Sequence, residues 1–124
     1  YDAYREKEAL WLKKIVETEE FRNASARIVF LHIPPPVGEW HGNVELRRLF
    51  MPILETADID VMFSGHTHKY SFHPAGSKAP FPLIVNDNAS YAKCEITQDK
   101  ITIRLVGLDG KNVRTHEFDT KKQK

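Results

Sequence analysis

Hydrophobic and polar positions follow two different periods in this chain, and the first is helical. In the first twenty residues the apolar side chains recur every three or four positions with charges between them, which predicts an amphipathic helix ending near Phe21. The same spacing returns from about Val44 to Ala57, where Pro52 predicts a kink or a break near Phe50. The pattern therefore predicts two helices that each bury one apolar stripe.

Two short apolar runs lie on either side of the second helix. Residues 28–31 and 59–64 lack regular polar alternation, which is typical of strands buried on both faces in a sheet covered by helices. The first run ends at His32 before three prolines, and the second ends at Gly65-His66-Thr67-His68. The strand–helix–strand order predicts parallel strands that carry polar chemistry at their carboxyl ends.

The last third of the chain alternates apolar and polar residues with the period of two of a β-strand, and two irregular segments come before it. Proline and glycine punctuate residues 33–42 and 69–82, which we expect to be irregular. Beyond them, four short strands are predicted, at the positions 83–86, 91–97, 101–108 and 113–118, with hairpin turns at 98–100 and 108–110. The fold class is therefore α/β, with a mixed sheet ending in antiparallel hairpins. We expect residues 120–124 to form a disordered basic tail after a domain of residues 1–119.

Composition narrows the class of protein. The chain has 124 residues, 41% of them hydrophobic and 28% charged, which suits one small domain. Its net charge of +1 and the lack of a basic face argue against a nucleic-acid partner, and no apolar run reaches the ~20 residues of a membrane span. Cys94 is the single cysteine, so an internal disulfide is excluded. Because the sequence starts at Tyr1, we expect a piece of a longer protein.

The histidines are the chemically informative residues. Neutral imidazole is the commonest protein ligand for transition metals, and His66 and His68 stand two apart directly after a strand, where Gly65 allows a tight exit. His32 ends the other strand, so parallel pairing would bring three imidazoles to one edge of the sheet. Ordinary polar loop histidines are the alternative explanation, and the pattern alone does not decide between them.

Two motifs and their separation resemble a known family. Leu31-His32-Ile33-Pro34, followed some thirty residues later by Gly65-His66-Thr67-His68, is similar to the carboxyl-terminal half of the calcineurin-like metallophosphoesterases. The resemblance implies half of a four-layer α/β/β/α sandwich. It also implies that His32 and His66 bind the second ion and His68 the first ion of a dinuclear centre of iron, manganese or zinc. The activity it implies is the hydrolysis of phosphate mono- or diesters by a metal-activated hydroxide.

Two further positions resemble the purple acid phosphatases of that superfamily. His41 lies nine residues after His32, in the loop where those enzymes hold phosphate-facing histidines, and Tyr70 completes a similar G-H-x-H-x-Y string. A solvated loop histidine and a tyrosine that packs the loop onto the core are the alternatives. Trp40 could wall the cleft or hold the proline loop, and we place His73 and His116 at the surface.

The family's amino-terminal motifs are missing. D-x-H, G-D-x-x-D and G-N-H-[DE], which supply the bridging carboxylate and the expected general acid, do not occur in this sequence. We therefore expect no catalytic residue in this chain and no hydrolysis by it, and its partners would be a phosphoester substrate and the missing amino-terminal half. Self-association through an exposed sheet edge is also expected. A non-catalytic interaction module with at most one three-histidine zinc site is the alternative.

Overall fold

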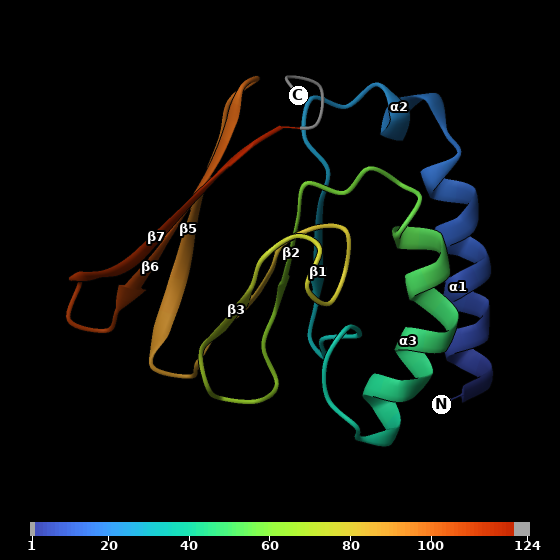
Figure 1. Cartoon of the computed structure of the whole chain (residues 1–124), viewed down its shortest axis with the longest axis horizontal. Coiled ribbons are helices and arrows are strands. Elements are labelled where there is room, and N and C mark those ends of the chain that lie inside the picture. Colours follow the sequence, from blue (N-terminus) through green and yellow to red (C-terminus); the bar gives the residue numbers. More distant parts are fainter. Residues whose placement is uncertain (1, 121–124) are drawn as a thin grey trace.

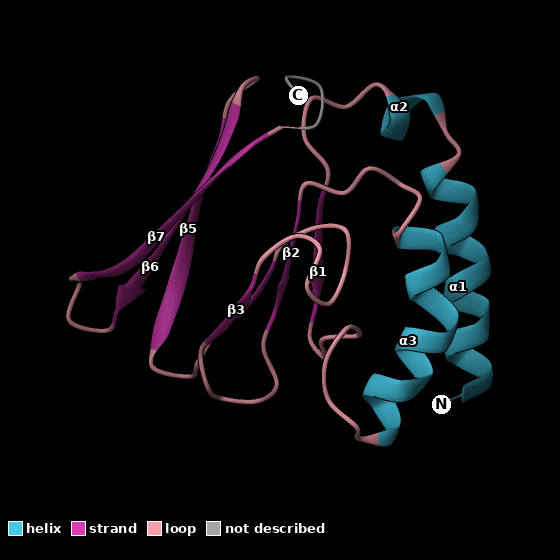
Figure 2. Ribbon diagram, viewed as in Figure 1, coloured by secondary structure: helices cyan, strands magenta, loops and turns pink. Residues whose placement is uncertain are grey.

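The computed structural model describes residues 2–120 and has three layers (Figure 1). Helices α1 (Asp2–Val16) and α3 (His41–Leu54) cover one face of a four-stranded sheet, and a three-stranded sheet lies beyond its other face, as Figure 2 shows by element type. A four-residue helix, α2 (Glu19–Arg22), precedes the first strand.

The first sheet has the strand order β1-β2-β4-β3. Strands β1 (Ile28–Leu31), β2 (Val61–Ser64) and β4 (Leu83–Val85) run parallel, and β3 (Ser71–His73) pairs antiparallel with β4. The parallel pairing of β1 with β2 confirms the strand–helix–strand prediction, with α3 as the crossover.

The second sheet is an antiparallel meander of three strands. Strands β5 (Ser90–Ile96), β6 (Lys100–Gly107) and β7 (Asn112–Asp119) follow one another through two hairpins, which confirms the predicted turns. Ile101, Ile103 and Leu105 of β6 point inward and are almost fully buried. They face Val61 and Ile84 of the first sheet, so one apolar core joins the two sheets. A second core lies between the first sheet and the helices.

The helices differ from the prediction at their ends. A turn at Glu17 and Thr18 ends α1 early, because the Thr18 side chain accepts a hydrogen bond from the Phe21 N–H at 3.2 Å and caps α2 instead. The second long helix begins three residues earlier than predicted. Pro52 falls in its last turn and does not break it, since the helix continues to Leu54.

Three predictions about strands and tail are corrected. The strand β1 is an edge strand and is not buried on both faces: the Phe30 side chain is 66% exposed. Residues 69–82 are not wholly irregular, because β3 lies within them. Thr120, which we placed in the tail, is buried and donates to the Gln98 carbonyl at 2.8 Å. The rest of the predicted tail, residues 121–124, lies outside the described residues.

Hydrogen bonds between Arg27 and Asp60 join the residues that precede β1 and β2. Each residue's backbone N–H donates to the other, since Arg27 N–H reaches the Asp60 carboxylate at 2.8 Å and Asp60 N–H reaches the Arg27 carbonyl at 2.9 Å. The buried Arg27 guanidinium donates to the carbonyls of Phe21, Arg22 and Asp58. This arginine therefore ties α2 and the loop before β2 to the sheet. None of the described helices is both long enough and apolar enough to cross a bilayer.

Candidate metal centre

The carboxyl ends of β1 and β2 bring two histidines together. The last register pair is Leu31 with Ser64, and the Gly65 N–H then donates to the His32 carbonyl at 3.0 Å. His32 Nε2 and His66 Nδ1 consequently lie 3.3 Å apart, with the two rings nearly perpendicular at 85°. The sequence predicted this convergence of His32 with His66, and the structure confirms it. Their role as metal ligands stays a prediction.

The backbone at this turn is strained on the histidines themselves. His66 and His68 have positive φ angles of 71° and 62°, in the left-handed region that costs a residue with a Cβ about 1–3 kcal/mol. Gly65, to which we assigned the unusual backbone angles, does not have a positive φ. Thr67 fixes the turn, because its hydroxyl donates to the Lys69 carbonyl at 3.0 Å and accepts from the Lys69 N–H at 3.3 Å. Strain of this kind is typical of functional sites.

Trp40 lies against His66. The two rings are stacked with centroids 5.0 Å apart and an angle of 26°, while the indole is 59% exposed. Gly42 makes room for this position, since a Cβ there would approach the Trp40 ring at 3.1 Å and the Ile33 side chain at 3.0 Å. Trp40 therefore lies beside His66, and its role as a wall of a cleft stays a prediction.

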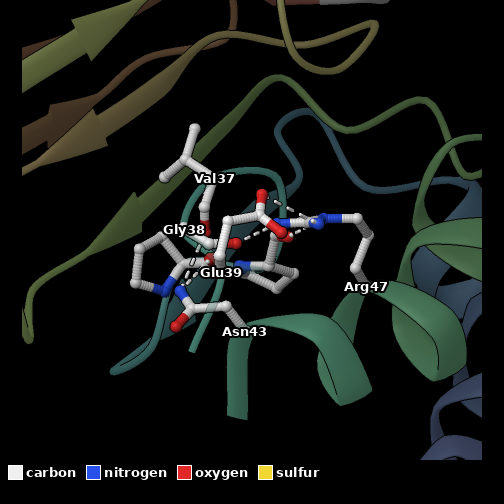
Figure 3. Close-up of polar contacts among 7 residues, drawn as sticks. Val37, Gly38, Glu39, Asn43 and Arg47 are labelled. Carbon is white, nitrogen blue, oxygen red and sulfur yellow. Dashed lines mark hydrogen bonds and ion pairs between the residues drawn. The ribbon is translucent and has the colours of Figure 1, made fainter. Parts of the chain in front are cut away.

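The proline loop between His32 and α3 is held by two side chains of that helix (Figure 3). The buried Asn43 amide donates to the carbonyls of Pro34 and Val37 at 2.9 and 2.8 Å. Arg47, one turn later, donates to the Pro35 carbonyl at 2.9 Å and to the Gly38 carbonyl, and it pairs with Glu39 at 3.8 Å. Sequence reasoning missed both residues. The signal was an amide and a guanidinium spaced one helical turn apart, directly after a loop whose prolines leave carbonyls unpaired.

The remaining candidate residues begin α3 or follow the end of β2. His41 is the exposed first residue of α3, and His68 is exposed after the turn. The Tyr70 hydroxyl lies 2.7 Å from His116 Nε2 on β7, and the Arg114 guanidinium stacks 3.8 Å above the Tyr70 ring. Tyr70 therefore links the two sheets.

His116 is half-buried rather than a plain surface residue. Burial, and to a smaller extent the charge of Arg114, lowers its pKa below the ordinary histidine range. His73 lies in β3 with its Nε2 3.2 Å from the Ser71 hydroxyl. Neither histidine is brought to the edge where His32 and His66 meet.

Two imidazoles are fewer ligands than a tetrahedral metal site needs. Within residues 2–120, no group of three or more histidine, cysteine, aspartate or glutamate side chains is placed to hold a metal ion. The distance within the pair nevertheless fits a metal: two imidazole nitrogens bound to one tetrahedral ion at about 2.0–2.1 Å lie about 3.3 Å apart. The donor chemistry therefore suits one side of a transition-metal site.

One cavity among the described residues lies away from this edge. It has a volume of about 590 Å³ and lies at the opposite end of the strands, between the ends of α1 and α3, with Arg27 and Asp58 in its wall. The donors of Arg27 are already paired with backbone carbonyls there. This cavity contains none of the candidate histidines.

Comparison with known families agrees with this arrangement of strands and histidines. The sequence profile described as calcineurin-like phosphoesterase matches residues 1–70, which include His32, His66 and His68. The chain belongs to the calcineurin-like phosphoesterase family. Its match covers the three helices α1, α2 and α3 and the turn that carries His66 and His68.

Solved structures similar to this family member show how much of a larger chain it spans. The structure of GAP50, the anchor in the inner membrane complex of Plasmodium, aligns with a TM-score of 0.74 at 19% identity, over 100% of this chain and 45% of that chain. A Vps29 double mutant from Entamoeba histolytica aligns over 60% of this chain and 47% of that chain at 21% identity, and its TM-score of 0.37 is too low to bear on the fold. No curated protein matches the chain. The chain thus spans less than half the length of the GAP50 structure, with which it shares the fold.

Proposed function

We propose that this chain carries the histidine side of the metal centre of a phosphoesterase that hydrolyses phosphate mono- or diesters. The observation that carries the proposal is the 3.3 Å distance between His32 Nε2 and His66 Nδ1, at the edge where open α/β sheets bind their ligands. Membership of the calcineurin-like phosphoesterase family supports it.

In this proposal His32 and His66 hold the second ion of a dinuclear centre, and His68 holds the first. Such a centre, when loaded with iron, manganese or zinc, supplies a hydroxide nucleophile near neutral pH and neutralises charge on the phosphoryl oxygens. The chain's own contribution is to orient the imidazoles. Parallel pairing places His32 level with Gly65, one residue before His66. The strained turn sets the direction of His66 and His68, and Trp40 covers one face of the His66 ring.

The missing amino-terminal half is the proposed source of the carboxylate ligands and the general acid. The open edge of β1 supports this role for a partner, because a groove of about 330 Å³ runs between that strand and α1. Trp11 and Phe30 line the groove and are 61% and 66% exposed, so a neighbouring strand and helix would bury them. His41 is proposed to face the substrate. Tyr70 is proposed to support the turn through its contact with His116 of the second sheet.

Phosphatase assays test the proposal directly. The 124-residue chain should show no turnover of p-nitrophenyl phosphate with added manganese, iron or zinc, because the bridging carboxylate is missing. A longer chain with the amino-terminal half should be active, and His66→Ala in it should remove the activity, whereas His73→Ala should not. Metal-dependent turnover by the short chain, or an active His66→Ala variant of the long one, would contradict the proposal.

A non-catalytic interaction module is the second candidate. It is favoured by the likeness in fold to GAP50, which is an anchor, and by the lack of a group of three metal-binding side chains among residues 2–120. Activity of the longer chain separates the two functions. A long chain that folds and binds its partners but hydrolyses no phosphoester with any of the three metals would establish the module.

A further inference from the structure

The strand β5 is an open edge of the second sheet with features that suit pairing. Its seven residues contain no proline, and their register with β6 runs without a shift from Ser90 to Ile96. Residues 91–96 are exposed. A long, regular edge of this kind presents a row of backbone donors and acceptors to another strand.

The outward backbone groups of β5 belong to its apolar residues. The Thr97 N–H donates to the Lys100 carbonyl at 2.9 Å and therefore points toward β6. Backbone groups alternate in direction along an antiparallel strand, so those of Ala92, Cys94 and Ile96 point away from β6. Their side chains share a face with Ile101 and its neighbours in the core, yet Ile96 is 54% exposed. An added strand would extend this apolar face.

The charges of β5 favour one particular partner. Lys93 lies directly across from Arg104 of β6, an unfavourable pair of like charges, while Glu95 pairs with the same arginine at 3.3 Å. If a second β5 runs antiparallel with the two-fold axis at Cys94, Lys93 meets the partner's Glu95. The small Ala92 then meets the large Ile96 of the partner subunit. Axes at Lys93 or Glu95 would instead place like charges opposite each other.

We propose that two copies of this chain associate through β5, antiparallel and centred on Cys94, so that their three-stranded sheets continue into one another. In this register the outward backbone groups of the two strands face each other, small side chains lie opposite large ones, and opposite charges pair. The interface is independent of the histidine edge and of the proposed hydrolysis, so either proposal can fail without the other.

Charge reversal with sedimentation equilibrium tests the interface. The 124-residue chain should form dimers, and Lys93→Glu should weaken dimerisation about ten-fold or more, because both symmetric pairs become repulsive. Glu95→Lys should do the same, and the double variant K93E/E95K should restore the dimer. Lys111→Glu, in the exposed turn after β6, is the matched control and should leave the dimer unchanged.

Cross-linking at Cys94 tests the register. The outward backbone groups of Cys94 make it a hydrogen-bonded pair with its copy, and such pairs in antiparallel strands have Cα atoms about 5.5 Å apart, within the range of a disulfide. With copper phenanthroline as oxidant, which accepts the two electrons as the two thiols lose their protons, Cys94 should form a covalent dimer, and K93E should suppress it. A chain that stays monomeric, a dimer that K93E/E95K does not restore, or a dimer that does not cross-link at Cys94 would overturn the proposal.

Discussion

The contact of Asn43 with the proline loop gives a sharp stability prediction. Replacement by alanine removes two hydrogen bonds, at 2.9 and 2.8 Å, and leaves the carbonyls of Pro34 and Val37 without this donor in a buried region. Each lost bond costs about 0.5–1.5 kcal/mol, and a buried acceptor left without a partner costs more, so Asn43→Ala should lower the free energy of unfolding by about 2–4 kcal/mol.

Urea unfolding measures the effect. With an m-value of about 1.5 kcal/mol/M, the midpoint should fall by about 1.3–2.7 M. Asn43→Asp should cost at least as much, because its carboxylate oxygens would face the two carbonyls without donating. Asn112→Ala is the matched control, since that exposed amide makes one bond to the Thr115 hydroxyl and should matter by less than about 0.5 kcal/mol. An Asn43→Ala chain as stable as the control would refute the reasoning.

Three further predictions concern the buried Arg27 and Ser64 and the half-buried His116. Arg27→Met should destabilise the chain by about 2–3 kcal/mol in urea, with Arg27→Lys intermediate, because three backbone carbonyls lose their donor. Ser64→Ala should raise the stability by about 1 kcal/mol in thermal unfolding, since the buried Ser64 hydroxyl has no hydrogen-bond partner within residues 2–120, and a loss of stability would contradict this. His116 has a lowered pKa, so the unfolded chain binds its proton more readily, and stability should fall as the pH drops below about 6.5. Urea titrations should show a smaller fall for His116→Gln, which can still accept from Tyr70, and equal falls would contradict the assignment.

The sequence predicted the parts of the fold that depend on period and punctuation. The parallel pair β1 and β2, the hairpins and the meeting of His32 with His66 all follow from short apolar runs and from where they end. It did not reveal that β1 is an edge strand, because an apolar run looks the same with one neighbouring strand as with two. β3 was missed since its three residues take their strand conformation from pairing with β4 and not from their own pattern.

The meeting of His32 with His66 was predicted from the sequence, and the geometry of the turn that carries His66 was not. Strand ends could be located, but the positive φ angles of His66 and His68 and the hydrogen bonds of Thr67 beside them are not encoded by any periodicity. The stacking of Trp40 depends on Gly42, and the buried Asn43 depends on the path of the loop in space. These contacts join residues through the tertiary fold, where a single sequence carries little signal.

Metal affinity of the histidine variants tests the central claim most directly. If His32 and His66 share one ion, titration of the chain with Co²⁺ should show one site, followed by absorption of the bound cobalt and by calorimetry. His32→Ala and His66→Ala should each weaken that binding at least about ten-fold, because one of two paired imidazole ligands is lost. His73→Ala is the control and should bind as the parent chain does. Equal affinity in the parent, His32→Ala and His66→Ala chains would contradict the assignment of these two histidines to a common metal ion.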